Sequence, residues 1–170
     1  ISEAPVVASI PAFNAFTTLI ETPPLSDKEL AQSMPLQAKQ YIPVPMSLNT
    51  LDWMKVGERV DDEGAKKVQI LLVAIPKDVV LRYQTIFRNA GLDLVALELE
   101  SVSLARALTI GKPGLSLIMD IGSRSSSISI AQNGLLQFAA QTDFAGASLT
   151  QTIATGLKLG MQRAEDMKRH

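Results

Sequence analysis

The sequence predicts a mixed α/β fold of the α+β type, and three observations lead to this prediction. Apolar segments of strand length alternate along the chain with segments that have helical periodicity. A strand, a helix and two further strands within residues 5–75 indicate a small sheet covered by a helix. Two strands joined by Asn133-Gly134, a typical hairpin turn, indicate a second small sheet after residue 115.

Composition excludes several classes of function. The 170 residues include 46% hydrophobic and 19% charged residues, as in an ordinary globular protein. Sixteen basic and 17 acidic residues give a net charge of −1, so nothing indicates binding to nucleic acid or to an anionic membrane. The absence of cysteine excludes disulfides and thiol catalysis, and a single histidine, His170, makes a histidine-based triad or metal cluster unexpected.

The first residues already have the character of a buried strand. Residues 5–10 are apolar, and the chain begins at Ile1 without an initiator methionine or a visible signal peptide. No apolar run approaches the ~20 residues needed to span a bilayer. We therefore expect the sequence to be part of a longer protein. A loop or short turn is expected over residues 11–16, followed by the apolar pair Leu19-Ile20.

A helix is predicted to begin after Ser26. Ser26 and Glu29 form a capping box, in which the hydroxyl accepts from the amide of Glu29 and the carboxylate reaches back to the N-cap. Apolar residues then recur at helical spacing as far as Tyr41. Pro35 lies inside this pattern and removes one backbone hydrogen bond, so we expect a kinked helix or two short turns.

Two strands are predicted next, over residues 48–55 and 67–75. Residues 57–64 are acidic and glycine-bounded, which is typical of a solvated hairpin loop. The alternating apolar side chains of the second strand, and Trp53 in the first, are expected in a core. Either edge of this sheet could accept a partner strand.

The middle of the chain is predicted to contain two helices and a strand. Pro76 and Asp78 suit a helix N-terminus, and Gly91 suits the C-terminal end of that helix. Residues 92–97 are strand-like, and residues 98–109 have the pattern of a second helix beginning with Glu98. Residues 111–114, Gly-Lys-Pro-Gly, are the clearest break, so we place a domain boundary there.

A serine-rich turn carries the most informative chemistry. Asp120 ends an apolar strand, and Gly122, Ser123, Ser125 and Ser126 follow it. Successive backbone N–H groups in such a turn form an anion-binding concavity. Mg²⁺ keeps several waters and needs few carboxylates, so Asp120 could hold it through water. The same pattern also describes an ordinary hairpin turn.

Two later positions are weaker candidates for the same site. Gly146 precedes a predicted helix over residues 148–157. A phosphate could approach bare amides at this glycine, or the glycine could simply belong to a tight turn with the N-cap of the helix. Glu165 lies on the last predicted helix, from Met161 to the end, and could face either a ribose or solvent.

Taken together, these segments resemble the family of the type IV pilus assembly protein PilM, actin-like ATPase-fold relatives of the division protein FtsA. The run Tyr41-Ile42-Pro43-Val44-Pro45, followed by Leu51-Asp52-Trp53, is the most specific part of the resemblance. The other matching stretches, in order along nearly the whole chain, are residues 8–13, 29–31, 72–77, 90–92, 98–106 and 120–130.

The resemblance implies a partial actin-like, ribonuclease H-like fold. Residues 1–97 would form the strand-helix-strand-strand (SHS2) module of subdomain 1C with a flanking strand and helix. Residues 98–114 would form a connecting helix and linker, and residues 115–170 the first part of subdomain 2A. The implied cofactors are ATP and Mg²⁺, and the implied nucleotide-binding residues are Asp120, Gly122, Ser123, Ser125, Ser126, Gly146 and Glu165.

The function that the resemblance implies is a cytoplasmic scaffold of pilus assembly, peripheral at the inner membrane through its partners. The implied partner is the cytoplasmic tail of a PilN-like inner-membrane protein, held in a groove beside 1C. Other inner-membrane platform proteins and a homo-oligomer are further expected partners, and no catalytic residue is assigned. The alternatives are an actin-like ATPase, whose longer form could have weak activity, and an FtsA-like division protein. With one phosphate turn, this stretch alone should bind Mg-ATP no tighter than about millimolar, roughly −4 kcal/mol.

Overall fold

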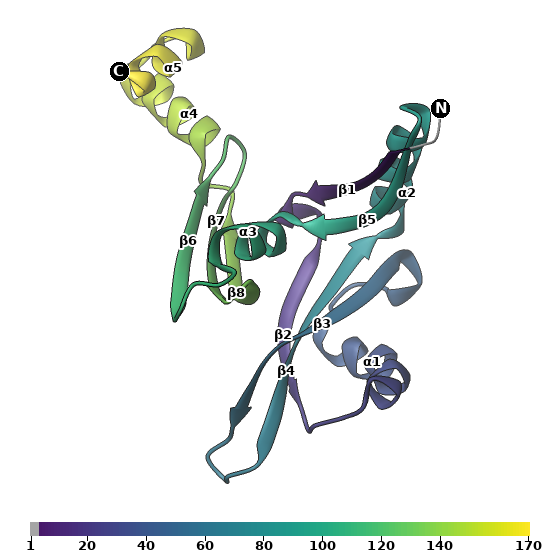
Figure 1. Ribbon diagram of the computed structural model, residues 1–170. Helices are drawn as coiled ribbons and strands as arrows, with labels where there is room; N and C mark the ends of the chain where they lie inside the picture. Colours follow the sequence, from purple (N-terminus) through teal and green to yellow (C-terminus); the bar gives the residue numbers. More distant parts are fainter. Residues whose placement is uncertain (1–3) are drawn as a thin grey trace.

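Three small sheets form the frame of the computed structural model, which describes residues 4–170 (Figure 1). One sheet has two strands and the other two have three strands each. Parallel and antiparallel pairing both occur, so the predicted mixed α/β class is confirmed. The first three residues of the predicted module over residues 1–97 lie outside the described residues, and the domain limits themselves stay predictions.

The two-stranded sheet pairs β1 (Ala4–Ile10) with β5 (Leu92–Leu99) in parallel. The helix α2 (Lys77–Asn89) leads into β5 and contacts it, and α3 (Glu100–Thr109) follows β5 directly. Glu98 was expected to begin that helix, and this expectation is wrong. Glu98 pairs with Ser9 in the β1–β5 ladder, so the strand continues through Leu99 before the helix begins.

The antiparallel three-stranded sheet has the order β2-β4-β3 and forms the SHS2 module with one helix. Its elements are β2 (Phe16–Thr22), α1 (Asp27–Tyr41), β3 (Asn49–Val60) and β4 (Lys66–Pro76). Short 3-10 turns precede β2 and β3, at η1 (Ala12–Asn14) and η2 (Met46–Leu48). The solvated loop is shorter than predicted, because the β3–β4 ladder continues as far as Val60 and Lys66.

The helix α1 is a single helix and not two short turns. Its capping box forms as predicted: the Ser26 hydroxyl accepts from the Glu29 amide, and a Glu29 carboxylate oxygen accepts from the Ser26 amide at 2.8 Å. Pro35 lies within the helix, where it costs one backbone bond. The buried residues Leu30, Met34 and Ala38 continue on one face past the proline, so packing on the sheet maintains the helix there.

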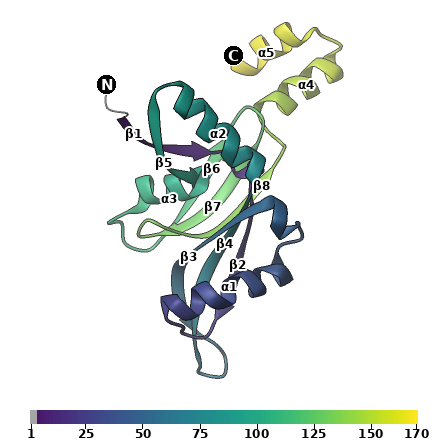
Figure 2. The same cartoon turned by 90° about the vertical axis from the view of Figure 1, so that its right-hand side faces the viewer.

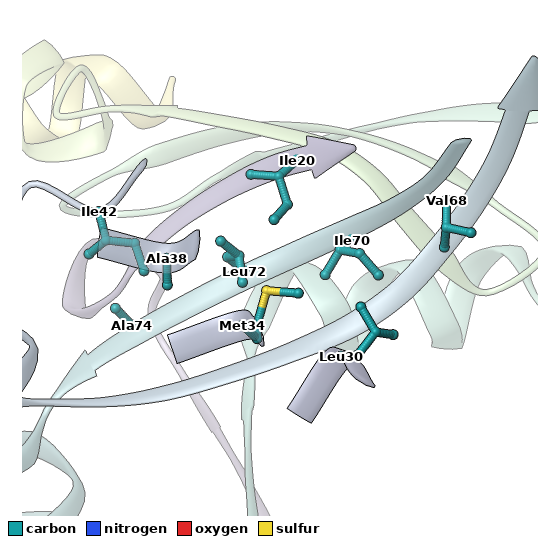
Figure 3. Close-up of a cluster of buried hydrophobic side chains, with 9 residues drawn as sticks. All are labelled: Ile20, Leu30, Met34, Ala38, Ile42, Val68, Ile70, Leu72 and Ala74. Atoms are coloured by element: carbon teal, nitrogen blue, oxygen red, sulfur yellow. The ribbon is translucent and has the colours of Figure 1, made fainter. Parts of the chain in front are cut away.

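A first hydrophobic core lies between α1 and one face of this sheet (Figure 3). The helix contributes Leu30, Met34 and Ala38, and the alternating residues of β4 point toward them from the sheet. Trp53 is partly buried and packs against this core, in agreement with its expected place. The remaining members of the cluster are Ile20, Ile42, Val68, Ile70, Leu72 and Ala74.

The third sheet is an antiparallel meander of β6 (Leu115–Ile121), β7 (Ser126–Gln132) and β8 (Leu135–Thr142). Asn133 and Gly134 join β7 to β8 with φ values of 48° and 82°, the left-handed backbone that favours this residue pair. The helices α4 (Gly146–Leu157) and α5 (Met161–Arg169) follow and pack on each other. Across residues 4–170, none of the helices is long and apolar enough to cross a membrane.

A second core joins the SHS2 sheet to the β6–β7–β8 sheet. Val56 and Leu71 lie on the face of the SHS2 sheet that α1 leaves uncovered, and Ala105 of α3 lies between the two sheets. Ala131 and Leu136 complete the cluster from β7 and β8. Figure 2 shows β7 and β8 beside β3 and β4, with α3 nearby. The predicted connecting helix is therefore part of the contact between the two sheets.

Candidate functional site

The serine-rich turn joins β6 to β7 and is closed by one backbone hydrogen bond. The Gly122 amide donates to the Ser125 carbonyl at 3.0 Å. A Cβ atom on Gly122 would lie 2.9 Å from the same carbonyl oxygen, so only glycine fits this position without displacing the backbone. Within residues 4–170, the amides of Ser123, Arg124 and Ser125 make no hydrogen bond. Three successive free amides are the arrangement that binds an anion.

The first turn of α4 is hydrogen-bonded to the backbone of the serine-rich turn. The amide of Gly146 donates to the Gly122 carbonyl at 3.0 Å, and the amide of Ala147 donates to the Ser123 carbonyl at 2.8 Å. The sequence left open whether the amides near Gly146 meet a phosphate or belong to a tight turn, and in this structure the Gly146 amide already has a partner. Its place in the site is to support the shape of the turn, and direct contact between Gly146 and a nucleotide stays a prediction.

Asp120 lies at the end of β6, half-buried, beside this turn. It is paired in register with Ser127 of β7, which is in turn paired with Gln141 of β8. No hydrogen bond to the Asp120 carboxylate is found within the described part of the chain. No group of three or more acidic or histidine side chains gathers there either. One carboxylate with water and phosphate oxygens is a donor set that suits Mg²⁺.

A cavity of about 480 Å³ lies between the serine-rich turn and η1. Phe13 of η1 forms one wall, Arg124 and Ser125 form the second, and the end of β8 forms the third through Gln141, Thr142 and Asp143. The Arg124 guanidinium lies 5.8 Å from the centre of the Phe13 ring, within cation–π distance. The cavity therefore presents a positive charge and free amides on one wall, which suits an anionic ligand.

Of the six residues that line this cavity, sequence reasoning identified only Ser125 and missed the others, among them Arg124 and Phe13. Arg124 is the middle residue of the serine-rich turn, and its positive charge inside a phosphate-type turn was the available signal. No neighbouring residue in the sequence indicated Phe13, because η1 meets the turn only through the tertiary fold.

Ser126 was predicted to contact a phosphate. Its hydroxyl is buried and has no hydrogen-bond partner in the described structure, and its backbone pairs with Ile121 in the β6–β7 ladder.

Glu165 belongs to a polar network that ties α5 to the first turn of α4. Its carboxylate accepts from the Thr150 hydroxyl, from Lys168 Nζ at 2.7 Å and from Arg169 Nε at 2.9 Å. Lys168 Nζ also donates to the Gly146 carbonyl at 3.0 Å. A positive charge is thus held next to the residue that supports the serine-rich turn. Glu165 as a ribose ligand stays a prediction, because its present contacts are all within the chain.

The Glu165 network predicts a dependence of stability on pH. The hydrogen bond from Lys168, followed by those from Thr150 and Arg169, lowers the pKa of Glu165 from 4.5 to about 2. A lowered pKa in the folded state stabilises the fold above the unfolded pKa, and this contribution disappears as pH falls toward the folded pKa. We expect Glu165→Gln to lower the thermal midpoint at pH values above about 4.5 and to match the wild type near pH 2.

Thermal unfolding followed by circular dichroism across that range measures the difference. Asp166→Asn is the matched control, because Asp166 is exposed on the same helix and, among the described residues, its carboxylate accepts only from Gln162, at 3.3 Å. A constant difference between wild type and Glu165→Gln at all pH values would contradict the prediction.

A second depression lies between β3, β5 and α3, with a volume of about 220 Å³. Its apolar walls come from Trp53, Met54, Val73 and neighbouring residues, and Asp52 and Glu98 add two carboxylates. Arg106 pairs with Glu98, and this hydrogen bond lowers the pKa of the carboxyl below 4.5. The remaining lining residues are Ile75, Leu97, Leu99 and Val102. We call this depression the β3–β5 groove.

Comparison with known proteins identifies a family and several structural neighbours. The family model described as type IV pilus assembly protein PilM matches residues 2–170. A structure described as the PilM–PilN type IV pilus biogenesis complex superposes with a TM-score of 0.79 at 24% sequence identity. That match covers 98% of this chain and 50% of the other, so the chain spans half the length of the protein it resembles.

Two further structures resemble parts of the chain. The cytoplasmic domain of EpsL, an inner-membrane component of the type II secretion system of Vibrio cholerae, matches with a TM-score of 0.54 at 17% identity. This match covers 89% of this chain and 53% of EpsL. Ethanolamine utilization protein EutJ from Carboxydothermus hydrogenoformans matches 51% of this chain and 31% of its own, with a TM-score of 0.43 and 29% identity. The first of these neighbours shares the overall fold.

Proposed function

Because the chain belongs to the family of the type IV pilus assembly protein PilM, we propose that it acts as a nucleotide-binding scaffold of pilus assembly. In this proposal the serine-rich turn takes the phosphates of a nucleotide, and the β3–β5 groove takes the cytoplasmic tail of a PilN-like inner-membrane protein. The observation that carries the proposal is the family match over residues 2–170, which includes both the turn and the groove. The predicted PilM resemblance and the partial actin-like fold are confirmed at the level of family and fold.

The serine-rich turn supports the nucleotide part of the proposal through its geometry. The free amide of Ser125 and the Arg124 charge line one cavity, the free amide of Ser123 belongs to the same turn, and the carboxylate of Asp120 lies at the end of β6 beside that turn. Bound Mg²⁺ would neutralise phosphate charge, and Asp120 would orient it through water. Gly122 keeps the turn in shape by allowing the close approach of the Ser125 carbonyl. These residues bind and orient a ligand, and none of them is assigned a part in bond cleavage.

The β3–β5 groove supports the partner part of the proposal through its chemistry. Apolar walls suit the side chains of an extended peptide, and the carboxylate of Asp52 suits a positive charge on it, whereas Glu98 is already paired with Arg106. Such a groove lies beside the SHS2 module, as the family resemblance implies. A scaffold of net charge −1 would then reach the cytoplasmic side of the inner membrane through its partner and not through its own surface.

The test is calorimetric titration with a peptide from the N-terminal cytoplasmic tail of the PilN-like partner. We expect Met54→Ala and Asp52→Lys each to weaken peptide binding at least about tenfold, because one removes part of an apolar wall and the other reverses a charge. Asp52 is exposed and its replacement leaves the core intact, whereas Met54 also packs on the second core, so circular dichroism confirms that each variant is folded.

Tyr41→Ala is the matched control, since Tyr41 is a half-exposed aromatic residue at the end of α1 and does not line the groove. Unchanged peptide affinity in both groove variants would place the partner elsewhere. A wild-type chain that fails to bind the peptide would remove the scaffold proposal.

A further inference from the structure

Two β-bulges face each other where the SHS2 sheet meets the β6–β7–β8 sheet. The β3–β4 ladder shifts between Lys55 and Gly57, which leaves Val56 without a ladder partner. The β7–β8 ladder shifts between Ile130 and Ala131, which leaves Gln137 as the extra residue of β8. A bulge redirects a side chain and bends its strand, and it is usually a specific feature of a fold and not a defect.

A side-chain hydrogen bond connects the two bulges. The Gln137 side-chain amide donates to the Val56 carbonyl, which the bulge has released from the ladder. Gly57 leaves the space for this contact, because a Cβ atom there would lie 2.7 Å from Gln69 Oε1 and 3.2 Å from Gln137 Oε1. Val56 is 1% exposed and Gln137 is half-buried, so the bond is partly shielded from water. A buried carbonyl left without this donor would be costly.

This hydrogen bond also joins the SHS2 sheet directly to the β6–β7–β8 sheet. Among residues 4–170 it is the one hydrogen bond between residues 16–76 and residues 115–170. The other contacts there are apolar and involve small or flexible side chains of the second core. Apolar packing tolerates small rotations, whereas a hydrogen bond weakens steeply with angle. Gln137 therefore supplies a direct polar restraint on the relative angle of the two sheets, beside the hydrogen bonds that tie the end of α3 to the β7–β8 turn.

The two bulged strands lead to the two sites described above. From Gln137, β8 runs directly to Gln141 and Thr142, which line the cavity at the serine-rich turn. From Val56, β3 runs back to Met54 and Asp52, which line the β3–β5 groove. The paired bulges are thus the point where the strand from one site touches the strand from the other.

We propose that the Gln137–Val56 contact couples the two sites, so that an anionic nucleotide at the serine-rich turn changes the affinity of the β3–β5 groove for its peptide. This inference rests on the proposed function, since it names how that function is regulated. Gln137 is a positioning residue in this scheme and touches neither ligand. Coupling of this kind is reciprocal, so the peptide changes nucleotide affinity by the same factor.

The test compares peptide affinity with and without saturating Mg-ATP in the wild type and in Gln137→Met. Methionine keeps the length of the side chain and removes the donor. We expect about a fivefold or larger change in the wild type. The ratio should fall close to one in Gln137→Met, while each ligand alone binds as before. Gln132→Met, a change of the same type at an exposed position of β7, should keep the wild-type ratio. A ratio of one in the wild type, or a wild-type ratio in Gln137→Met, would overturn the proposal.

A ligand-free measurement separates this inference from the proposed function. The chain has no cysteine, so spin labels can be placed at Asp62→Cys in the β3–β4 loop and at Lys158→Cys after α4. We expect Gln137→Met to broaden or shift the distance distribution between the labels, and Gln132→Met to leave it unchanged. An unchanged distribution in Gln137→Met would overturn the role of the bulges. Failure of the wild type to bind peptide, with a shifted distribution, would instead count against the groove.

Discussion

Leu72→Ala is expected to lower the free energy of unfolding by about 2–5 kcal/mol, because it removes buried methyl groups and leaves a cavity. Leu72 is fully buried on β4, the central strand of the SHS2 sheet, and belongs to the core between that sheet and α1. Met34 and Ala38 of α1 cannot close the gap easily, since the helix is fixed by its capping box and by packing along its length. Urea unfolding followed by circular dichroism measures the loss.

Leu36→Ala is the matched control for this prediction. Leu36 lies on α1 but is 68% exposed, so its replacement should change the free energy of unfolding by no more than about 0.5 kcal/mol. The same chemical change therefore tests burial alone. A loss below about 1 kcal/mol for Leu72→Ala would show that the α1–sheet core does not hold the module together.

The sequence predicted those parts of the fold that depend on residues a few positions apart. The capping box at Ser26 and Glu29, the alternating apolar face of β4 and the Asn133-Gly134 turn each formed as expected. Each depends on residues a few positions apart, so the pattern contains the whole cause. At Pro35 the alternative of two short turns is wrong, because packing of α1 on the sheet outweighs the broken backbone bond and the helix continues.

The candidate site was only partly predictable, because its geometry depends on contacts between distant residues. The serine-rich turn was recognisable from its composition, but the bonds from the Gly146 and Ala147 amides to its carbonyls join residues more than twenty positions apart. Glu165 was identified as a candidate without its partner Thr150, which only the packing of α5 on α4 brings to it, whereas Lys168 lies three residues away on the same helix.

The β-bulges left no signal that could be read from one strand alone. A bulge is a mismatch in register between two paired strands, so Val56 and Gln137 are defined by their partner strands and not by their own neighbours. Gly57 was read as the start of a loop, whereas in the structure it lies inside β3 and makes room for the Gln69 and Gln137 side chains. A glycine within a strand pattern is a signal for such close approach.

Asp120→Asn is expected to abolish the Mg²⁺ dependence of nucleotide binding at the serine-rich turn and to weaken Mg-ATP binding at least about tenfold, or 1.4 kcal/mol. Asparagine keeps the shape of the side chain but lacks the negative charge that orients hydrated Mg²⁺. We expect Mg-ATP, at millimolar concentration, to shift the amide resonances of Ser123, Arg124 and Ser125 in the wild type. The shifts should be weak and independent of Mg²⁺ in the variant.

Asp93→Asn is the matched control, because Asp93 is an exposed acid in β5 and lines neither the cavity nor the groove. The control should respond to Mg-ATP as the wild type does. Equal Mg²⁺-dependent shifts in wild type and Asp120→Asn would mean that Asp120 does not orient the metal. Shifts that appear away from the turn would mean that the free amides there are not the phosphate site, and that the nucleotide part of the scaffold proposal must be abandoned.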